Sequence, residues 1–208
     1  LDVPFDIFKE TAASEAPNPS LWSANISSRC GADPEGVIRA VDMLLAAKKP
    51  AIVIGQGVRY GGATMELRAL SERLQIPVAA SASGLGAIPV DHPLSLGLVQ
   101  RGGTYQANHA CRQADVLMAL GVRFDDRTSS SWIPGYSFTI PPTKLIHVDI
   151  DPEEIGRNYP VALGLMADVR TFLRQILAEL DRRGHSTEPT AHSQKWLAMI
   201  DSYRAEWN

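Results

Sequence analysis

The sequence lacks most features of secreted, metal-binding and membrane-spanning proteins. Its only two cysteines, Cys30 and Cys111, lie far apart and outside any metal-ligand spacing, so we expect two reduced thiols. No apolar run approaches the roughly 20 residues that cross a bilayer. The formal net charge of -3 provides no basic surface for nucleic acid or an anionic membrane. We therefore expect a cytoplasmic protein that binds neither nucleic acid nor membrane.

The two ends of the chain differ from its middle. The opening Leu1-Asp2-Val3-Pro4 has no methionine and no basic stretch of a signal peptide, and is typical of the interior of a longer polypeptide. Residues 1–33 are rich in Pro, Ser and Asn, which predicts a linker from a preceding domain. Residues 182–208 predict a second linker, then an amphipathic helix from Ser193 to Trp207, toward a following domain.

Residues 34–181 alternate between helical and strand patterns and are enough for one sizeable core. Apolar runs predict strands at 51–54, 77–80, 116–120, 145–150 and 162–165. Helical spacing predicts helices at 34–49, 63–74, 105–113 and from 168 onward, with a short helix after Asp151. The strands are apolar on both faces, which is typical of a parallel sheet covered by helices on both sides. The predicted fold is α/β, Rossmann-like and three-layered.

Ligands of open parallel sheets bind at the carboxyl ends of the strands. The first predicted strand ends in Gly55-Gln56-Gly57, and Arg59 follows. Glycines at this spacing let backbone N–H groups approach a phosphate, but they also fit a tight turn. The spacing of these glycines differs from the dinucleotide-binding fingerprint G-x-G-x-x-G. The second strand ends in Ser81-Ala82-Ser83, which offers no acidic side chain to bind a ribose hydroxyl. A standard NAD site is therefore not expected.

The third and fourth strand ends carry charge. Gly121 is followed by Arg123, Asp125, Asp126 and Arg127, where arginines can pair with phosphate and aspartates can orient them or hold a sugar hydroxyl. A solvated charge cluster on a loop is the alternative interpretation.

Asp149, at the fourth strand end, can accept hydrogen bonds from ribose or adenine, whereas His147 is more typical of a core histidine. We find no serine-histidine-acid arrangement, no paired carboxylates with a plausible cleft and no G-x-S-x-G motif, so we expect no catalytic residue and no metal ligand in this chain.

Several segments resemble a known family. Pro50–Gly57, Ile76–Val78, Gly84–Gly86, Ala114–Leu117 and His147–Gly156 are similar to the central domain of thiamine-diphosphate (ThDP)-dependent enzymes, and the resemblance covers residues 36 to about 180. Leu1–Pro4 looks like the end of the first domain of such enzymes. The run from Gly121 to Arg127 resembles specifically the acetolactate synthase (acetohydroxyacid synthase) branch.

The resemblance implies a six-stranded parallel sheet and an extended FAD without a net redox role. Carried across residue by residue, the family's FAD contacts fall on Gly55, Gln56, Gly57, Arg59, Ser81, Ala82, Ser83, Gly121, Arg123, Asp125, Arg127, Asp149, Ile150, Asp168 and Val169. Asp126 and Arg127 would also approach the substrate channel. The chain departs from the family at Gln56, which replaces a glycine, at residues 100–103, which lack the family's Met and His, and in a longer loop from Thr128 to Pro142.

The resemblance also implies a parent enzyme of branched-chain amino acid biosynthesis. That enzyme decarboxylates pyruvate or another 2-keto acid on ThDP, transfers the fragment to a second keto acid, and works as a homodimer or homotetramer. The family's catalytic glutamate and its Mg²⁺ and diphosphate motif belong to domains outside residues 1–208, so we expect the chain alone to be inactive.

Two alternatives remain open. The first is another ThDP-dependent carboligase or lyase with a degenerate, empty nucleotide site. The second is a stand-alone nucleotide-binding or NAD-dependent deacylase-like domain, which two isolated cysteines disfavour because a deacylase would show a zinc-binding set.

Overall fold

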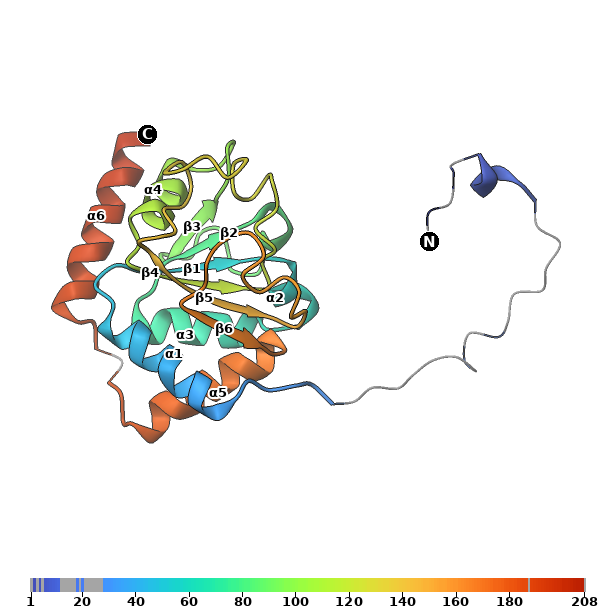
Figure 1. Cartoon of the computed structure of the whole chain (residues 1–208). Coiled ribbons are helices and arrows are strands. Elements are labelled where there is room, and N and C mark those ends of the chain that lie inside the picture. Colours follow the sequence, from blue (N-terminus) through green and yellow to red (C-terminus); the bar gives the residue numbers. More distant parts are fainter. Residues whose placement is uncertain are drawn as a thin grey trace.

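The computed structural model describes residues 2, 4, 6–11, 18, 20, 28–186 and 188–207 (Figure 1). A six-stranded sheet forms its centre, with β1 (Pro50–Ile54), β2 (Val78–Ala80), β3 (Ser95–Leu98), β4 (Val116–Leu120), β5 (Lys144–Asp149) and β6 (Leu163–Met166). All neighbouring pairs are parallel, in the order β3-β2-β1-β4-β5-β6. The predicted all-parallel, six-stranded sheet is confirmed.

Helices cover both faces of this sheet, which confirms the three-layer prediction (Figure 1). The helices are η1 (Ile7–Lys9), α1 (Pro34–Ala46), α2 (Gln56–Tyr60), α3 (Thr64–Leu74), η3 (Ala82–Gly84), α4 (Tyr105–Gln113), α5 (Val169–Arg182) and α6 (Ala191–Trp207). Apolar residues of α1, α3 and α5 share one core with Ile52 and Ile54, and those of α4 and α6 share another with Ala51 and Val53. Successive residues of one strand thus enter opposite cores, since side chains alternate along a strand.

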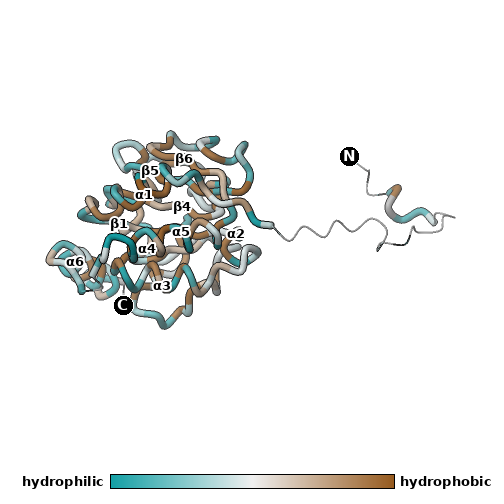
Figure 2. The backbone as a smooth tube through the Cα atoms, turned by 90° about the horizontal axis from the view of Figure 1, so that it is seen from below, coloured by the Kyte–Doolittle hydropathy of each residue, from teal (hydrophilic) through white to brown (hydrophobic). Residues whose placement is uncertain are grey.

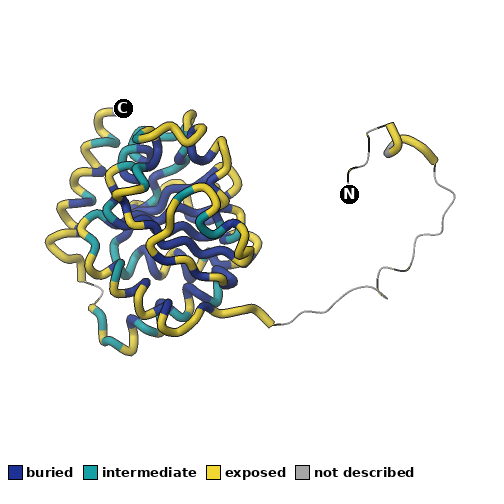
Figure 3. The backbone as a smooth tube through the Cα atoms, viewed as in Figure 1, coloured by how far each residue is buried: buried dark blue, intermediate teal, exposed yellow. Residues whose placement is uncertain are grey.

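Burial follows the same arrangement. Figure 3 shows the buried residues along the strands, and Figure 2 shows hydrophilic and hydrophobic residues alternating along the surrounding helices. Cys30 is exposed, Cys111 is buried, and both are free thiols. Burial raises the pKa of the Cys111 thiol to about 12, so this side chain packs as a small apolar group. No helix in the described part of the chain is long and apolar enough to cross a membrane.

Three predicted helix starts are confirmed by their caps. The Asp33 side chain accepts a hydrogen bond from the Gly36 amide at 3.1 Å, and Pro34 occupies the first turn of α1. Thr104 caps α4, and the Asp168 carboxylate caps α5 by accepting from the Thr171 amide at 3.0 Å. These side chains satisfy amides that lack a partner within the helix, which explains where each helix begins.

Two predictions at the level of elements need correction. The edge strand β3 was not predicted from the sequence, because Gly97, with φ +80°, interrupts a short run that is only partly buried. The short helix predicted after Asp151 is wrong, because the segment is a series of turns. There the Asp151 carboxylate accepts from the Glu153 amide at 2.9 Å, and Gly156, with φ +77°, redirects the chain toward β6.

The C-terminal helix packs on the domain. In α6, Trp196 and Ile200 are 2% and 1% exposed, in the core that α6 shares with α4. The Trp196 indole donates a hydrogen bond to the Pro50 carbonyl at 2.9 Å, and Arg204 donates to the carbonyls of Pro93 and Ser95. The helix is therefore tied to the first residue of β1 and to the edge strand.

We expect Trp196→Ala to destabilise the chain by about 3–5 kcal/mol, because it opens a cavity under α6 and leaves the Pro50 carbonyl without its donor. Urea denaturation measures the change. The matched variant Trp196→Phe keeps a ring but removes the donor, and we expect it to cost less than the alanine. Equal losses for both variants would contradict the packing role.

Candidate functional site

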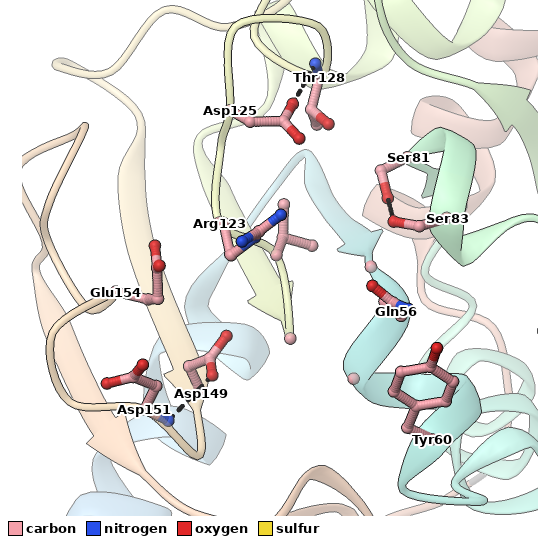
Figure 4. Close-up of a pocket in the computed structure, with 14 residues that line it drawn as sticks. Gln56, Tyr60, Ser81, Ser83, Arg123, Asp125, Thr128, Asp149, Asp151 and Glu154 are labelled. Atoms are coloured by element: carbon pink, nitrogen blue, oxygen red, sulfur yellow. Dashed lines mark hydrogen bonds between the residues drawn. The ribbon is translucent and has the colours of Figure 1, made fainter. Parts of the chain in front are cut away.

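A cleft of about 310 Å³ lies at the carboxyl edge of the sheet, above the ends of β1, β2, β4 and β5 (Figure 4). The chain order of the strands reverses between β1 and β4, and in open parallel sheets this is where ligands bind. The lining residues are Gly55, Gln56, Gly57, Tyr60, Ser81, Ser83, Gly121, Val122, Arg123, Asp125, Thr128, Asp149, Asp151 and Glu154.

Nine of the fifteen residues expected to contact a cofactor line this cleft. They are Gly55, Gln56, Gly57, Ser81, Ser83, Gly121, Arg123, Asp125 and Asp149. The other six, Arg59, Ala82, Arg127, Ile150, Asp168 and Val169, do not line it. The structure thus brings residues from four strand ends to one place, while their role in binding stays a prediction.

The six residues outside the cleft are either exposed or occupied by a structural contact. Arg59, Ala82 and Arg127 are exposed, and Ile150 is 63% exposed. Asp168 is 7% exposed, where it caps α5 and forms an ion pair with Arg29 at 3.0 Å. Val169 belongs to the core beneath the sheet. Capping and packing account for Asp168 and Val169 without a ligand.

Five lining residues were not among the expected contacts: Tyr60, Val122, Thr128, Asp151 and Glu154. Tyr60 could have been found, because it lies four residues after Gln56 in α2, and such residues share one helix face. Asp151 and Glu154 were not recognised as lining residues, because we predicted a helix after β5 where the chain forms turns.

Glycines allow the loops after β1 and β4 to touch. A Cβ on Gly55 would lie 2.0 Å from the Gly121 carbonyl oxygen, and one on Gly57 would lie 2.8 Å from the Gly121 Cα. Gly121 has φ +58°, and its own Cβ would lie 2.6 Å from the Gly57 Cα. Close packing between two loops is therefore a sufficient reason for all three glycines, and no phosphate is needed to explain them.

Charge is unevenly distributed around the cleft. Arg123 is the single cation among the described lining residues, against Asp125, Asp149, Asp151 and Glu154. In Figure 4 its side chain projects toward the centre, between the carboxylates on the β5 side and Gln56, Ser81 and Ser83 opposite. The cleft thus has acceptors at one end and donor side chains at the other.

All four carboxylates already have a partner, because Asp151 accepts from the Glu153 amide at 2.9 Å. Asp125 accepts from the Thr128 amide at 2.8 Å, Asp149 accepts from the Asp151 amide at 3.0 Å, and Glu154 pairs with Arg157 at 3.0 Å. These donors come from the same loops as the acids, so they fix the side chains and offset part of the negative charge.

His147 is a core residue, as predicted. It is 2% exposed; its Nδ1 accepts from the Gly156 amide at 3.3 Å, and its Nε2 donates to the Val122 carbonyl at 2.8 Å. A neutral imidazole satisfies both bonds. Burial is the largest influence on the ring and lowers its pKa, against smaller opposing effects of the Val122 carbonyl, Asp149 and Glu154.

The arrangement suits a ligand that offers hydroxyl or amino donors at one end and a negative group at the other. Across residues 28–186 and 188–207, no group of His, Cys, Asp or Glu is placed to hold a metal ion. A volume of about 310 Å³ is at the lower end of the range for small-molecule pockets, roughly 300–1,000 Å³. It is therefore large enough for a small ligand or for one part of an extended ligand.

We expect Gly57→Ala to destabilise the chain by about 1–3 kcal/mol, since the added methyl group forces the two loops apart. Thermal or urea denaturation measures this. Gly102→Ala is the control, because nothing lies within 4 Å of its built Cβ. If both variants lose the same stability, the loop contact does not explain the glycine.

Acid should weaken the fold through His147. Its pKa in the folded chain lies below the ordinary value of about 6.5, so the neutral ring stabilises the fold above that pH, and the contribution is lost as pH falls through the folded-state pKa. We expect the urea midpoint to drop more between about pH 7.5 and about pH 5.5 in the unmodified chain than in His147→Gln. His109, whose pKa burial also lowers, is present in both, so the difference isolates His147.

Comparison with known proteins places the domain in a family. A profile of the family described as "Thiamine pyrophosphate enzyme, central domain" matches residues 37–176. The isozyme 3 large subunit of acetolactate synthase from Escherichia coli is 35% identical over 192 residues, which cover 90% of this chain and 33% of that protein.

Relatives from other organisms agree. A probable acetolactate synthase large subunit from Methanocaldococcus jannaschii is 40% identical over 147 residues, 71% of this chain and 24% of that protein. An acetolactate synthase from Mycobacterium bovis is 33% identical over 204 residues, 98% of this chain and 32% of that protein. The chain spans about a third or less of the length of these relatives. It belongs to the central-domain family of thiamine pyrophosphate (ThDP) enzymes, and within that family it is similar to acetolactate synthase large subunits.

Proposed function

We propose that this chain is the nucleotide-holding central domain of a ThDP-dependent 2-keto acid carboligase of the acetolactate synthase kind. The cleft that crosses four strand ends, in a domain of this family, is the observation that carries the proposal. The parent enzyme would decarboxylate pyruvate or another 2-keto acid and join the remaining fragment to a second keto acid. It would act in the cytoplasm as a homodimer or homotetramer.

The chain would contribute binding, not catalysis. Residues 34–181 form the proposed domain, and residues 1–33 and 182–208 would connect it to neighbouring domains. Those domains would supply the residues that hold ThDP, which provides the decarboxylation chemistry, and Mg²⁺. The chain alone would then form no acetolactate from pyruvate.

The adenosine diphosphate half of FAD would lie across the cleft. Arg123 would pair with the diphosphate, since a guanidinium binds such oxygens in a bidentate way. Asp149 would accept from a ribose hydroxyl or from the adenine amino group, and Ser81 and Ser83 would donate from the opposite wall. Gln56 would place its amide beside the diphosphate, at a position where the family resemblance implies glycine. The flavin would extend beyond the cleft.

A second candidate rests on charge. One arginine faces four carboxylates in the described lining, which opposes binding of a diphosphate. The domain would then belong to another ThDP-dependent carboligase or lyase whose nucleotide site is empty.

FAD titration of the purified chain, followed by flavin fluorescence, distinguishes the two candidates. We expect saturable binding, competition by ADP, and an affinity lowered roughly 10- to 100-fold by Arg123→Ala, because a charge-assisted pair is lost. Arg59→Ala is the matched control: the resemblance gives it a contact, but its side chain does not line the cleft, so we expect unchanged affinity.

The flanking domains can complete the site, so the titration is repeated on a longer polypeptide that includes them. Absence of FAD binding in both would contradict the FAD proposal and favour the empty-site enzyme. An equal effect of both arginine substitutions would contradict the placement of the diphosphate beside Arg123.

A further inference from the structure

The segment after β4 is held by its carbonyl groups. His147 Nε2 donates to the Val122 carbonyl at 2.8 Å, and Asn158 Nδ2 donates to the carbonyls of Arg123 at 2.9 Å and Phe124 at 3.2 Å. The Phe124 carbonyl also accepts from Trp132 Nε1 at 3.0 Å. The Ser129 hydroxyl lies 3.1 Å from the same oxygen but is closer to the Asp125 carbonyl, to which it donates. Side chains from outside the strand thus bind three consecutive carbonyls, and the middle one belongs to the cleft's only described cation.

The same segment is strained. Phe124 has φ +51°, a left-handed conformation that costs an L-residue with a side chain free energy. Its ring is 1% exposed and makes edge-on contacts with Phe138, His147 and Tyr159. Such a conformation persists only where surrounding contacts impose it. The buried ring and the donors on its carbonyl supply those contacts, and they fix the direction in which Arg123 and Asp125 leave the backbone.

Asn158 also connects the two sides of the cleft. It lies in the turns after β5, the segment that carries Asp151 and Glu154 into the lining, and it binds the loop that carries Arg123 and Asp125. His147 makes a parallel, buried connection between the Gly156 amide and the Val122 carbonyl. Asn158 is itself exposed, so burial does not explain its place, whereas its two hydrogen bonds do.

We propose that Asn158 and Trp132 are positioning residues that hold the loop from Val122 to Asp125 in the conformation that binds a nucleotide. Neither residue lines the cleft, so both act through the backbone of this loop. That this conformation binds a nucleotide rests on the proposed function, whereas the claim that Asn158 and Trp132 hold the loop does not depend on it.

Two substitutions remove the donors with little change of shape. Asn158→Leu keeps the size of the side chain without its amide, and Trp132→Phe keeps an aromatic ring without the indole N–H. Gln194→Leu is the matched control, an exposed amide on α6, which does not contribute to the cleft. Amide hydrogen exchange of residues 122–128, FAD affinity and the thermal midpoint are measured on all four chains.

We expect exchange in residues 122–128 to rise roughly fivefold or more in both variants, as loss of one or two hydrogen bonds predicts. FAD affinity should fall by about the same factor while the thermal midpoint shifts only a few degrees. The control should match the unmodified chain. A purely structural role would lower the midpoint and leave the affinity of the folded chain unchanged.

Unchanged exchange in both variants overturns the inference. Faster exchange with unchanged FAD affinity overturns the positioning role, because the loop would then be held for another reason. If neither the unmodified chain nor the longer polypeptide binds FAD, the proposed function fails, and the exchange result alone still decides whether Asn158 and Trp132 hold the loop.

Discussion

The contact between the loops after β1 and β4 determines where everything else at this edge can lie. β1 and β4 pair in register from Pro50 and Val116 to Ile54 and Leu120, so their following residues meet directly. Glycine backbones fill this meeting point, and a side chain there would overlap the opposite loop. The floor of the cleft is consequently backbone, and every side chain available to a ligand must come from its walls. Gln56 and Tyr60 occupy one wall and Arg123 the other.

The fold could be predicted because the residues within each central strand indicate that the strand is buried. Residues 51–54 and 116–120 are apolar without alternation, which is typical of strands in a sheet buried on both faces. The caps at Asp33 and Asp168 mark two helix starts locally. The elements that failed depend on tertiary contacts. β3 is an edge strand, and what identifies it as a strand is its pairing with β2, which the sequence does not show. The acids after Asp151 look like a helix start, but Gly156 and its bond to His147 impose turns.

The sequence predicts at which edge of the sheet the site lies, but it does not predict which side chains line it. Strand ends identified the correct side of the sheet, and the resemblance supplied residues on it. Which neighbour enters the cleft depends on helix phase and turn geometry. Tyr60 lines the cleft and Arg59 does not, and Asp149 lines it while Ile150 is exposed. Asp168 shows a further limit of prediction from sequence. An aspartate after a strand can cap the next helix or contact a ligand, and the sequence does not distinguish the two roles.

The excess of carboxylates in the cleft is less unfavourable to a diphosphate than their number indicates. Asp125, Asp149 and Glu154 each have a donor from their own segment, and the acids of the β5 side lie across the cleft from Ser81 and Ser83. A ligand that places hydroxyl groups against the acids and its phosphates beside Arg123 meets a complementary surface at both ends. The reverse orientation would bring phosphates to the carboxylates. For the nucleotide proposed above, this charge distribution would therefore favour one direction across the sheet edge.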